Sequence, residues 1–211
     1  MKIAISIFII LCILYFVKGC QTGYVNNNDV WSWVTIDESH GKRLHWIEGI
    51  DQNSFEVLKN KNFALDQHQV YFKGRKINHA SPDGFLPLTE DEYGYAKDSK
   101  HAFFNNEVII NADPTTFEVL KFPYAKDKND VYCGTVPMKL SREDVLSFKV
   151  TNDDELMAGM ISTTTLSHFL ELHPEYQWLT EQGIDIQSII TGQTGTGETT
   201  NQKFLGFKKV K

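Results

Sequence analysis

Three kinds of apolar patterning follow one another along the chain. Residues 3–17 (IAISIFIILCILYFV) form an unbroken apolar run of 15 residues. Between about residue 29 and residue 135, short apolar or aromatic runs alternate with turn residues, which is typical of short β-strands. Residues 166–182 instead space their apolar side chains as a helix does. The pattern therefore predicts an N-terminal leader, a β-rich body and a short helical segment near the C-terminus.

The β-rich body contains an internal repeat with a period of about 30 residues. One pattern is an Ala-x-Asp turn followed by apolar residues, with aspartates at Asp66, Asp98 and Asp127. The second pattern places a Leu three residues after a Phe, at Phe55, Phe85 and Phe117. Two patterns that recur with the same period predict a mainly β (α+β) fold of β-hairpin or meander repeats. Whether the sheet stays open or partly closes into a barrel is left open.

The third copy of the repeat resembles a known family. Residues 124–132 (YAKDKNDVY), together with segments such as ADPTTFEVL, look like the DKNYY family of bacterial exported repeat proteins. Asp127, Lys128 and Asn129 match the first letters of the name, Tyr132 matches its first Tyr, and Cys133 replaces its second. The resemblance covers roughly residues 45–135. It implies export and a repeat architecture, and it brings no agreed activity and no catalytic residues.

The repeated aspartates could be interpreted as turn caps or as a calcium or catalytic row. An Asp carboxylate in a turn accepts hydrogen bonds from backbone N–H groups two residues on. A calcium loop needs several oxygen ligands at alternate positions, whereas one acid recurs in each repeat here. We therefore expect Asp66, Asp98 and Asp127 to cap turns.

The N-terminal apolar run is typical of a cleavable bacterial signal peptide, because it is shorter than the roughly 20 residues of a membrane-spanning helix. It ends in VKGC, which resembles the lipobox, and predicts cleavage between Gly19 and Cys20 with fatty acylation of Cys20. Lys18 departs from the small or apolar residue usual in that motif. Two alternatives therefore remain: cleavage by the ordinary signal peptidase, and an uncleaved membrane anchor. Each alternative places residues 21–211 outside the cytoplasm.

The predicted organisation has four segments. They are a signal peptide (1–19), a lipidated tether (20–29), a DKNYY-like β-repeat region (30–150) and an α/β segment packed on the repeats (151–211). Within the last segment we expect helices over 166–182, with a break at Pro174, a strand at 184–187 and a flexible Gly/Thr-rich loop at 191–200. A short helix after Ser141 and a charged loop at 152–155 complete the prediction.

Charge and cysteine content narrow the functional classes. The formal net charge of −6 becomes −8 without residues 1–19, which hold two lysines and no acid. Such a chain repels phosphate backbones, so nucleic acid is not an expected partner. Cys133 is expected to be a buried thiol, or to form a disulfide with Cys20 if Cys20 is not acylated.

Few residues suggest a functional site. Trp31 and Trp33 share one face of a predicted strand and could bind a partner, although core packing is the stronger interpretation. No cofactor or metal motif is present, and no nucleophile motif either; a hydrolase interpretation would rest on Ser162–Thr165 and His168. The expected function is therefore non-catalytic binding of another macromolecule, with a membrane attachment through the lipid on Cys20. The alternative is an immunity protein that neutralises a toxin delivered to the periplasm, and an envelope hydrolase is third. The expected location is the bacterial cell envelope, facing the periplasm or the exterior.

Overall fold

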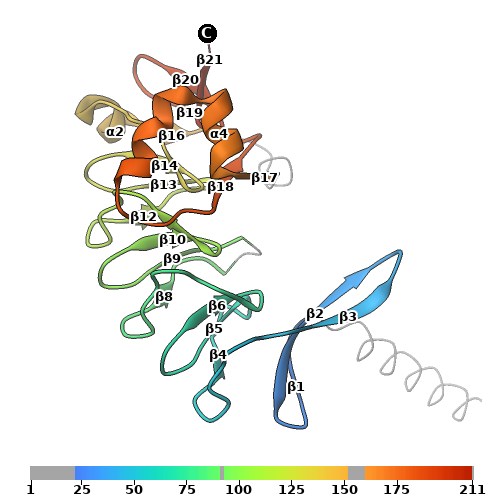
Figure 1. Ribbon diagram of the computed structural model, residues 1–211. Helices are drawn as coiled ribbons and strands as arrows, with labels where there is room; N and C mark the ends of the chain where they lie inside the picture. The colour runs from blue at the N-terminus through green and yellow to red at the C-terminus, as the bar shows by residue number, and fades with distance from the viewer. Residues whose placement is uncertain (1–21, 91–92, 152–159, 211) are drawn as a thin grey trace, which may run out of the picture.

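The structure, a computed structural model, describes residues 22–90, 93–151 and 160–210. Within these residues, small antiparallel sheets stack into a column, and a hairpin projects from the N-terminal end of the column (Figure 1). The mainly β class and the repeat architecture are confirmed. The predicted signal peptide, Cys20 and the charged loop at 152–155 lie outside the described residues.

Three regular units in the middle of the column share one four-stranded meander, in which strands that follow one another in the chain also pair. The first unit comprises β4 (Glu56–Val57), β5 (Phe63–Leu65), β6 (Val70–Phe72) and β7 (Arg75–Lys76). The second comprises β8 (Leu86–Pro87), β9 (Tyr95–Lys97), β10 (Ala102–Phe104) and β11 (Glu107–Ile109). The third comprises β12 (Glu118–Val119), β13 (Tyr124–Lys126), β14 (Val131–Cys133) and β15 (Val136–Pro137).

A buried aspartate closes the loop between the second and third strands of each regular unit. Asp66 is fully buried, and its Oδ1 accepts the backbone N–H groups of His68 and Gln69, both at 2.7 Å. Its Oδ2 accepts the N–H of Asp51 at 3.0 Å and the hydroxyl of Tyr71 at 2.9 Å. We call this arrangement the aspartate clasp. The clasp joins the loop before the first strand to the loop before the third.

The other two regular units repeat the backbone hydrogen bonds of the clasp, and the third also repeats the tyrosine bond, from Tyr132. Asp98 Oδ2 accepts the N–H of Ser81 at 2.9 Å, and Asp127 Oδ2 accepts the N–H of Asp113 at 2.6 Å. The Oδ1 atom of each again accepts the N–H groups two and three residues on. The turn-cap interpretation of the three aspartates is therefore confirmed.

A phenylalanine ring connects each unit to the one before it. It lies between an aromatic ring of the preceding unit and an aromatic ring of its own third strand. The ring of Phe117 has its centroid 5.7 Å from that of Tyr95 and 5.8 Å from that of Tyr132. The corresponding triplets are Tyr24–Phe55–Tyr71, Phe63–Phe85–Phe103 and Tyr124–Phe148–Phe204. We call these four triplets the aromatic ladder, and they form the apolar contact between neighbouring units.

Tyrosine hydroxyls of the ladder also hydrogen-bond to the next unit. The hydroxyl of Tyr95 donates to the carbonyl of Pro123 at 2.7 Å and accepts the N–H of Gly134 at 3.0 Å. Tyr124 reaches the carbonyls of Gly195 and Gly206 in the same way, at 2.8 and 2.9 Å. These bonds fix the rotation of one unit relative to its neighbour, which apolar contact alone does not.

The first described strands form a modified unit at the N-terminal end. They are β1 (Gly23–Asn27), β2 (Val30–Asp37) and β3 (Gly41–Trp46). Tyr24 pairs with Trp33 across β1 and β2, as Tyr124 pairs with Cys133 across β13 and β14 of the third unit. Strand β1 therefore corresponds to the second strand of a regular unit, and β2 to the third. Residues 23–27, which we expected to belong to a tether, therefore form a strand. The reason is a tight turn at Asn28 and Asp29, both at positive φ, which folds β1 onto β2.

The β2–β3 hairpin continues beyond the point at which a regular unit turns. In the third unit Cys133 pairs with Val136 across a two-residue turn. In the N-terminal unit the equivalent Trp33 pairs with His45, and the hairpin runs on to a turn that ends at Gly41. We call residues 34–46 the arm. Figure 1 shows that the arm projects away from the column.

The last unit of the column is interrupted by an insertion. It comprises β16 (Lys149–Val150), β19 (Thr196–Glu198), β20 (Lys203–Leu205) and β21 (Lys208–Val210), paired in that order. Thr199 stands at the aspartate position, and its Oγ1 accepts the N–H of Gln202 at 3.1 Å. The prediction of a flexible loop at 191–200 is therefore wrong. Gly197 belongs to a strand, where a Cβ atom would come within 2.4 Å of the Phe148 ring.

The insertion holds the helices and a two-stranded ribbon. Its elements are β17 (Ile161–Thr165), α4 (Leu166–Leu172), the 3₁₀-helix η1 (Pro174–Glu181) and β18 (Ser188–Gly192). The helix break at Pro174 is confirmed, whereas residues 184–187 are not strand. The helix after Ser141 is also confirmed, as α2 (Arg142–Ser147).

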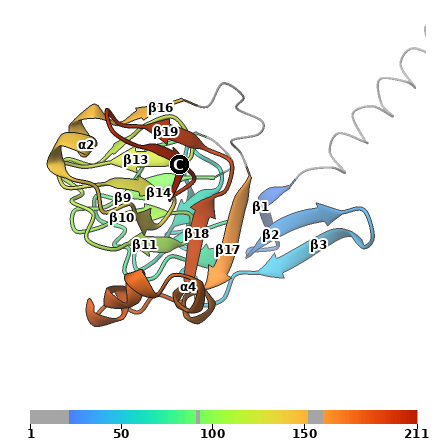
Figure 2. The same cartoon turned by 90° about the horizontal axis from the view of Figure 1, so that it is seen from above.

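The β17–β18 ribbon lies along the side of the column (Figure 2). The carbonyl of Ile190 in β18 accepts the N–H of Thr135 at 2.8 Å, in the hairpin turn of the third unit. Ser188 Oγ donates to Glu107 Oε1 in the second unit at 2.6 Å. Strand β18 therefore lies beside the hairpin turns of two units, on the side of the column from which the arm also departs (Figure 2).

Candidate functional site

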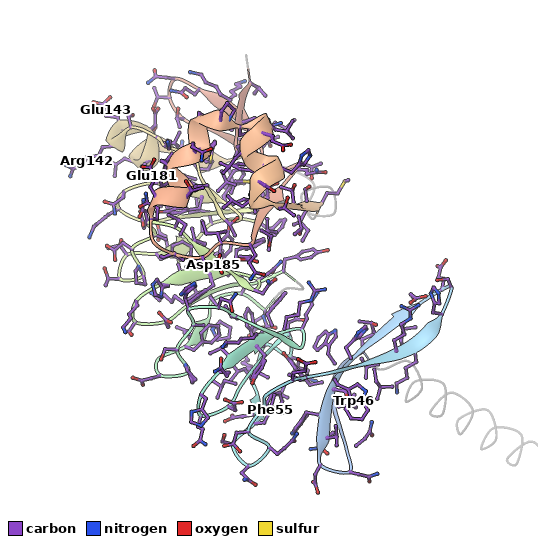
Figure 3. All side chains as sticks on the ribbon, viewed as in Figure 1. Trp46, Phe55, Arg142, Glu143, Glu181 and Asp185 are labelled. Carbon is purple, nitrogen blue, oxygen red and sulfur yellow. The ribbon has the colours of Figure 1, made fainter. Side chains whose placement is uncertain are left out.

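The two tryptophans singled out in the sequence lie at the junction between the N-terminal and first regular units. Trp33 is 9% exposed and packs edge-on against Tyr24, with ring centroids 4.8 Å apart. Trp31 is half-buried and lies 4.8 Å from the ring of Phe55. Both indoles therefore serve packing. The exposed indole belongs to Trp46, at the end of β3, which is 73% exposed (Figure 3).

Cys133 is a buried thiol, as expected. It is fully buried in β14, and its Sγ donates to the carbonyl of Gly192 at 3.5 Å. Burial raises the pKa of the thiol to about 12, because the thiolate would lose its hydration. Cys133 therefore has none of the thiolate character that a nucleophile needs. Gly19 and Cys20, the expected cleavage and lipidation residues, lie outside the described residues.

The arm exposes an apolar face. Residues that pair directly across β2 and β3 point to the same side, and Ile36, Leu44 and Trp46 are together on one side. Their exposed fractions are 41%, 45% and 73%. Strand β3 pairs with β2 alone among the described strands, so its outer edge presents unpaired backbone groups. An apolar face beside a free strand edge is a typical docking surface for another chain.

A cleft of about 480 Å³ separates the arm from the column. The arm contributes Thr35, His45 and Trp46 to its lining. The hairpin turns of the first and second units contribute, among others, Lys73, Arg75 and Asn106. The ribbon contributes Thr163 and Ser188. We call this space the arm cleft, and its lining combines aromatic rings with hydroxyl, amide and cationic groups.

A buried carboxylate lies behind the arm cleft. Glu107 is 6% exposed, and its Oε1 accepts Ser188 Oγ at 2.6 Å and Asn106 Nδ2 at 3.3 Å. Burial raises the pKa of Glu107 above its ordinary value, and the nearby Asp185 adds to the effect against the opposing hydrogen bond from Ser188. Glu107 thus holds the side chains of two cleft residues in fixed orientations.

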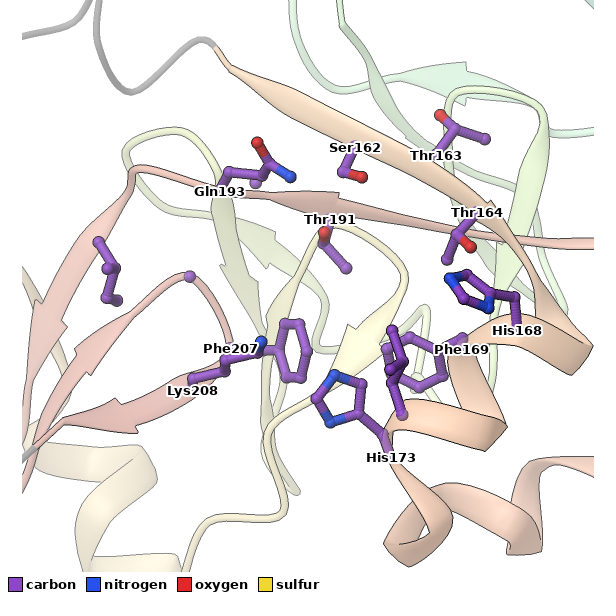
Figure 4. A pocket seen from close by; sticks show the side chains of 14 residues that line it. Ser162, Thr163, Thr164, His168, Phe169, His173, Thr191, Gln193, Phe207 and Lys208 are labelled. Atoms are coloured by element: carbon purple, nitrogen blue, oxygen red, sulfur yellow. The ribbon is translucent and has the colours of Figure 1, made fainter.

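A second pocket, of about 490 Å³, lies between the ribbon, α4 and the last unit (Figure 4). Hydroxyl groups of Ser162, Thr164 and Thr191 line one part of it, and the rings of Phe169 and Phe207 line another. Figure 4 shows that His168 and His173 also lie at this pocket, on either side of Phe169. The residues of the hydrolase interpretation are therefore close in space.

The second pocket does not hold an assembled catalytic pair in the described part of the chain. There, neither imidazole ring is hydrogen-bonded to a hydroxyl of Ser162–Thr165; His168 Nδ1 lies 3.3 Å from Glu171, and His173 Nδ1 lies 3.4 Å from Glu175. A nucleophile of this type needs a base within hydrogen-bond reach. Among the described residues, no three His, Cys, Asp or Glu side chains lie close enough together to hold a metal ion.

Comparison with known proteins identifies the family of the chain. One family model, described as the DKNYY family, matches residues 35–94, 84–135 and 95–206. The chain belongs to the DKNYY family. Asp127 and Tyr132, which carry the resemblance to the family name in the sequence, hydrogen-bond to each other in the third clasp at 2.9 Å. The DKNYY match extends past the regular repeats into the interrupted last unit, as far as the turn after β20. No curated protein and no solved structure matches the chain.

The likeness to DKNYY noted in the sequence is thereby confirmed, and it reaches further than residues 45–135. In the described part of the chain, no helix has the length and apolar character needed to cross a membrane.

Proposed function

We propose that this DKNYY protein is a non-catalytic binding protein of the bacterial cell envelope, which engages another protein through its arm. The observation that carries the proposal is the exposed apolar face of Ile36, Leu44 and Trp46 beside the free edge of β3. Soluble proteins usually protect such an edge, because it invites pairing with another strand. A partner strand added along β3 would satisfy its free backbone groups and cover the apolar side chains.

The construction of the column also supports a binding role. The aromatic ladder and the tyrosine hydroxyl bonds give each unit fixed contacts with its neighbours, so the column is a rigid support for the arm. Regular units turn after two residues, whereas the N-terminal unit extends the same hairpin into the arm. The arm is therefore an addition that the packing of the column does not require.

Replacement of Leu44 by Asp tests the proposed docking surface. We expect Leu44→Asp to abolish co-purification of the partner from envelope extract, because a carboxylate would be buried without a counter-charge. Leu86→Asp is the matched control, since Leu86 is also exposed, at 52%, but lies on the column. The measurement is quantitative mass spectrometry of proteins retained by the full chain and each variant. Equal recovery with Leu44→Asp and Leu86→Asp would contradict the proposal.

The proposed membrane attachment rests on Cys20 and is tested separately. We expect Cys20→Ser to lose labelling by a radioactive fatty acid and to move from the membrane fraction to the soluble fraction. Cys133→Ala is the control, because Cys133 is buried in the column and should leave both properties unchanged. A Cys20→Ser chain that stays in the membrane fraction without label would show an uncleaved anchor instead.

A further inference from the structure

The second pocket, between the ribbon, α4 and the last unit, is lined by hydrogen-bonding groups that have no partner within the described chain. We infer that the second pocket binds an amphipathic organic anion, with its charged head at the ribbon hydroxyls and Lys208 and its apolar body against Phe169 and Phe207. The pocket volume of about 490 Å³ lies within the range of about 300–1,000 Å³ that is common for small-molecule sites. This ligand is independent of the protein partner proposed for the arm.

The register of the ribbon places a row of hydroxyl groups on one face. Ser162 pairs with Thr191 across β17 and β18, so their side chains point to the same side. Thr164 points to that side as well, because it lies two residues from Ser162 in the same strand. All three line the second pocket, and none of their hydroxyl groups is hydrogen-bonded to another described residue. Each can therefore donate a hydrogen bond to a ligand.

Thr191 is the buried member of this row. The residue is 7% exposed, although its hydroxyl has no hydrogen-bond partner in the described part of the chain. A buried polar group without a partner costs free energy, and such groups are uncommon in folded proteins. Thr191 lines the pocket beside Gln193, whose side-chain amide is likewise unpaired among the described residues (Figure 4). A ligand acceptor at this place would satisfy both groups.

The turn between β20 and β21 brings a positive charge to the ribbon. Gly206 in this turn lies against β18, since a Cβ atom on it would come within 2.6 Å of the Gly192 carbonyl oxygen. Lys208 follows, and its Nζ lies 5.6 Å from the centroid of the Phe207 ring. Within the described chain, Lys208 has no ion pair and no Asp or Glu lines the pocket. This lining favours an anionic head group.

Two imidazole rings also line the pocket, and each is oriented by a glutamate of its own segment. His168 Nδ1 lies 3.3 Å from Glu171, and His173 Nδ1 lies 3.4 Å from Glu175. The Nε2 atom of each ring has no such partner in the described part of the chain. The two carboxylate side chains are 74% and 61% exposed and do not line the pocket. They therefore stabilise the rings from outside without placing a negative charge in the lining.

An apolar wall faces part of the same space. The rings of Phe169 and Phe207 have their centroids 5.6 Å apart, and Leu172 and Leu205 extend this wall to the rim. Both leucines are largely exposed, at 63% and 46%. An apolar ligand body would remove these surfaces from water, which is favourable. Inorganic phosphate would leave the wall unused, and a hydrocarbon would leave the hydroxyl groups unused.

The test is calorimetric titration of the full chain in detergent with 3-phenylpropanoate and with octanoate. The primary amide of each acid is the uncharged probe of the same shape. We expect at least one acid to bind with a dissociation constant below about 1 mM, and its amide to bind at least about tenfold more weakly. Leu44→Asp on the arm should leave this binding unchanged.

Substitutions in the pocket locate the binding. Lys208→Gln and Thr191→Val should each weaken the acid at least about tenfold. Lys209→Gln is the matched control, because Lys209 pairs with Phe204 on the other face of β20 and β21 and does not line the pocket. It should keep the affinity within about twofold. Thermal unfolding of Thr191→Val verifies the fold, and the exposed Lys208 can be replaced without disturbing the core.

Four results would overturn the inference. The first is that neither acid binds at millimolar concentration. The second is that acid and amide bind equally. The third is that Lys208→Gln and Lys209→Gln have the same effect on the affinity. The fourth is that inorganic phosphate binds as tightly as the better acid.

Discussion

Phe117→Ala is expected to lower the free energy of unfolding by about 3–5 kcal/mol, the usual cost of removing a buried ring. Phe117 is 5% exposed and lies between Tyr95 of the second unit and Tyr132 of the third. Its loss would open a cavity at the contact between two units. In a stacked repeat each unit is stabilised by its neighbours, so one weakened contact affects the units on both sides. Denaturant unfolding followed by circular dichroism measures the effect.

An exposed side chain on the same column gives the comparison for Phe117→Ala. Leu86 is 52% exposed, and Leu86→Ala should change the stability by less than about 0.5 kcal/mol. A loss below about 1 kcal/mol for Phe117→Ala would show that the aromatic ladder does not hold the units together. Two separate unfolding transitions in Phe117→Ala would instead show that the contact between the second and third units is the one that has weakened.

Asp66→Ala is expected to cost about 3 kcal/mol or more, because it leaves several hydrogen-bond donors of the clasp without an acceptor. The buried carboxylate accepts three backbone N–H groups and the hydroxyl of Tyr71. Asp66→Asn should cost less, since its amide oxygen still accepts two of these donors. Asp83, which is exposed in the loop before Phe85, is the control, and Asp83→Ala should be nearly neutral. Equal stability of Asp66→Ala and Asp83→Ala would contradict the clasp.

The clasp also makes a pH-dependent contribution to stability. Burial opposes ionisation of Asp66, but the N–H groups of Asp51 and His68 and the Tyr71 hydroxyl outweigh it, so its pKa is lowered below the ordinary 3.8. A lowered pKa in the folded state stabilises the fold above the unfolded-state pKa. That contribution is lost as the pH falls through the folded-state value. The stability gap between wild type and Asp66→Asn should therefore be full at pH 6 and shrink below about pH 4.

The regular units were predictable from the sequence because each keeps both of its markers. Asp66, Asp98 and Asp127 recur with the phenylalanines at one period, and turn chemistry assigns the aspartates to caps. The aromatic triplets were not predictable. They join residues of different units, and a period does not state which rings face each other.

The two terminal units were not predicted because neither has an aspartate at the clasp position. The N-terminal unit has a tight turn at Asn28 and Asp29 in place of the clasp loop, and the last unit has Thr199. Two signals remained in the sequence. Phe148 follows Phe117 by 31 residues, close to the period, and Tyr24 precedes Trp33 by the spacing that separates Tyr124 from Cys133. The insertion between β16 and β19 separates the first strand of the last unit from its other three strands, so the repeat period is interrupted there.

The arm cleft could not be found in the sequence at all. Its walls come from the arm, two hairpin turns and the inserted ribbon, which are far apart along the chain. No pattern in the sequence separates Trp46 from the packed Trp31 and Trp33. Only the register of β2 and β3 places Trp46 on the exposed face.

Site-specific photocrosslinking in intact cells tests most directly whether the arm binds a partner protein. A photoreactive amino acid at position 44 places the probe on the apolar face of the arm, and one at position 99 places it in the exposed clasp loop of the second unit. We expect a single discrete protein adduct from position 44 and none from position 99. Absence of an adduct at position 44, or the same adduct from both positions, would contradict the arm as the partner-binding surface.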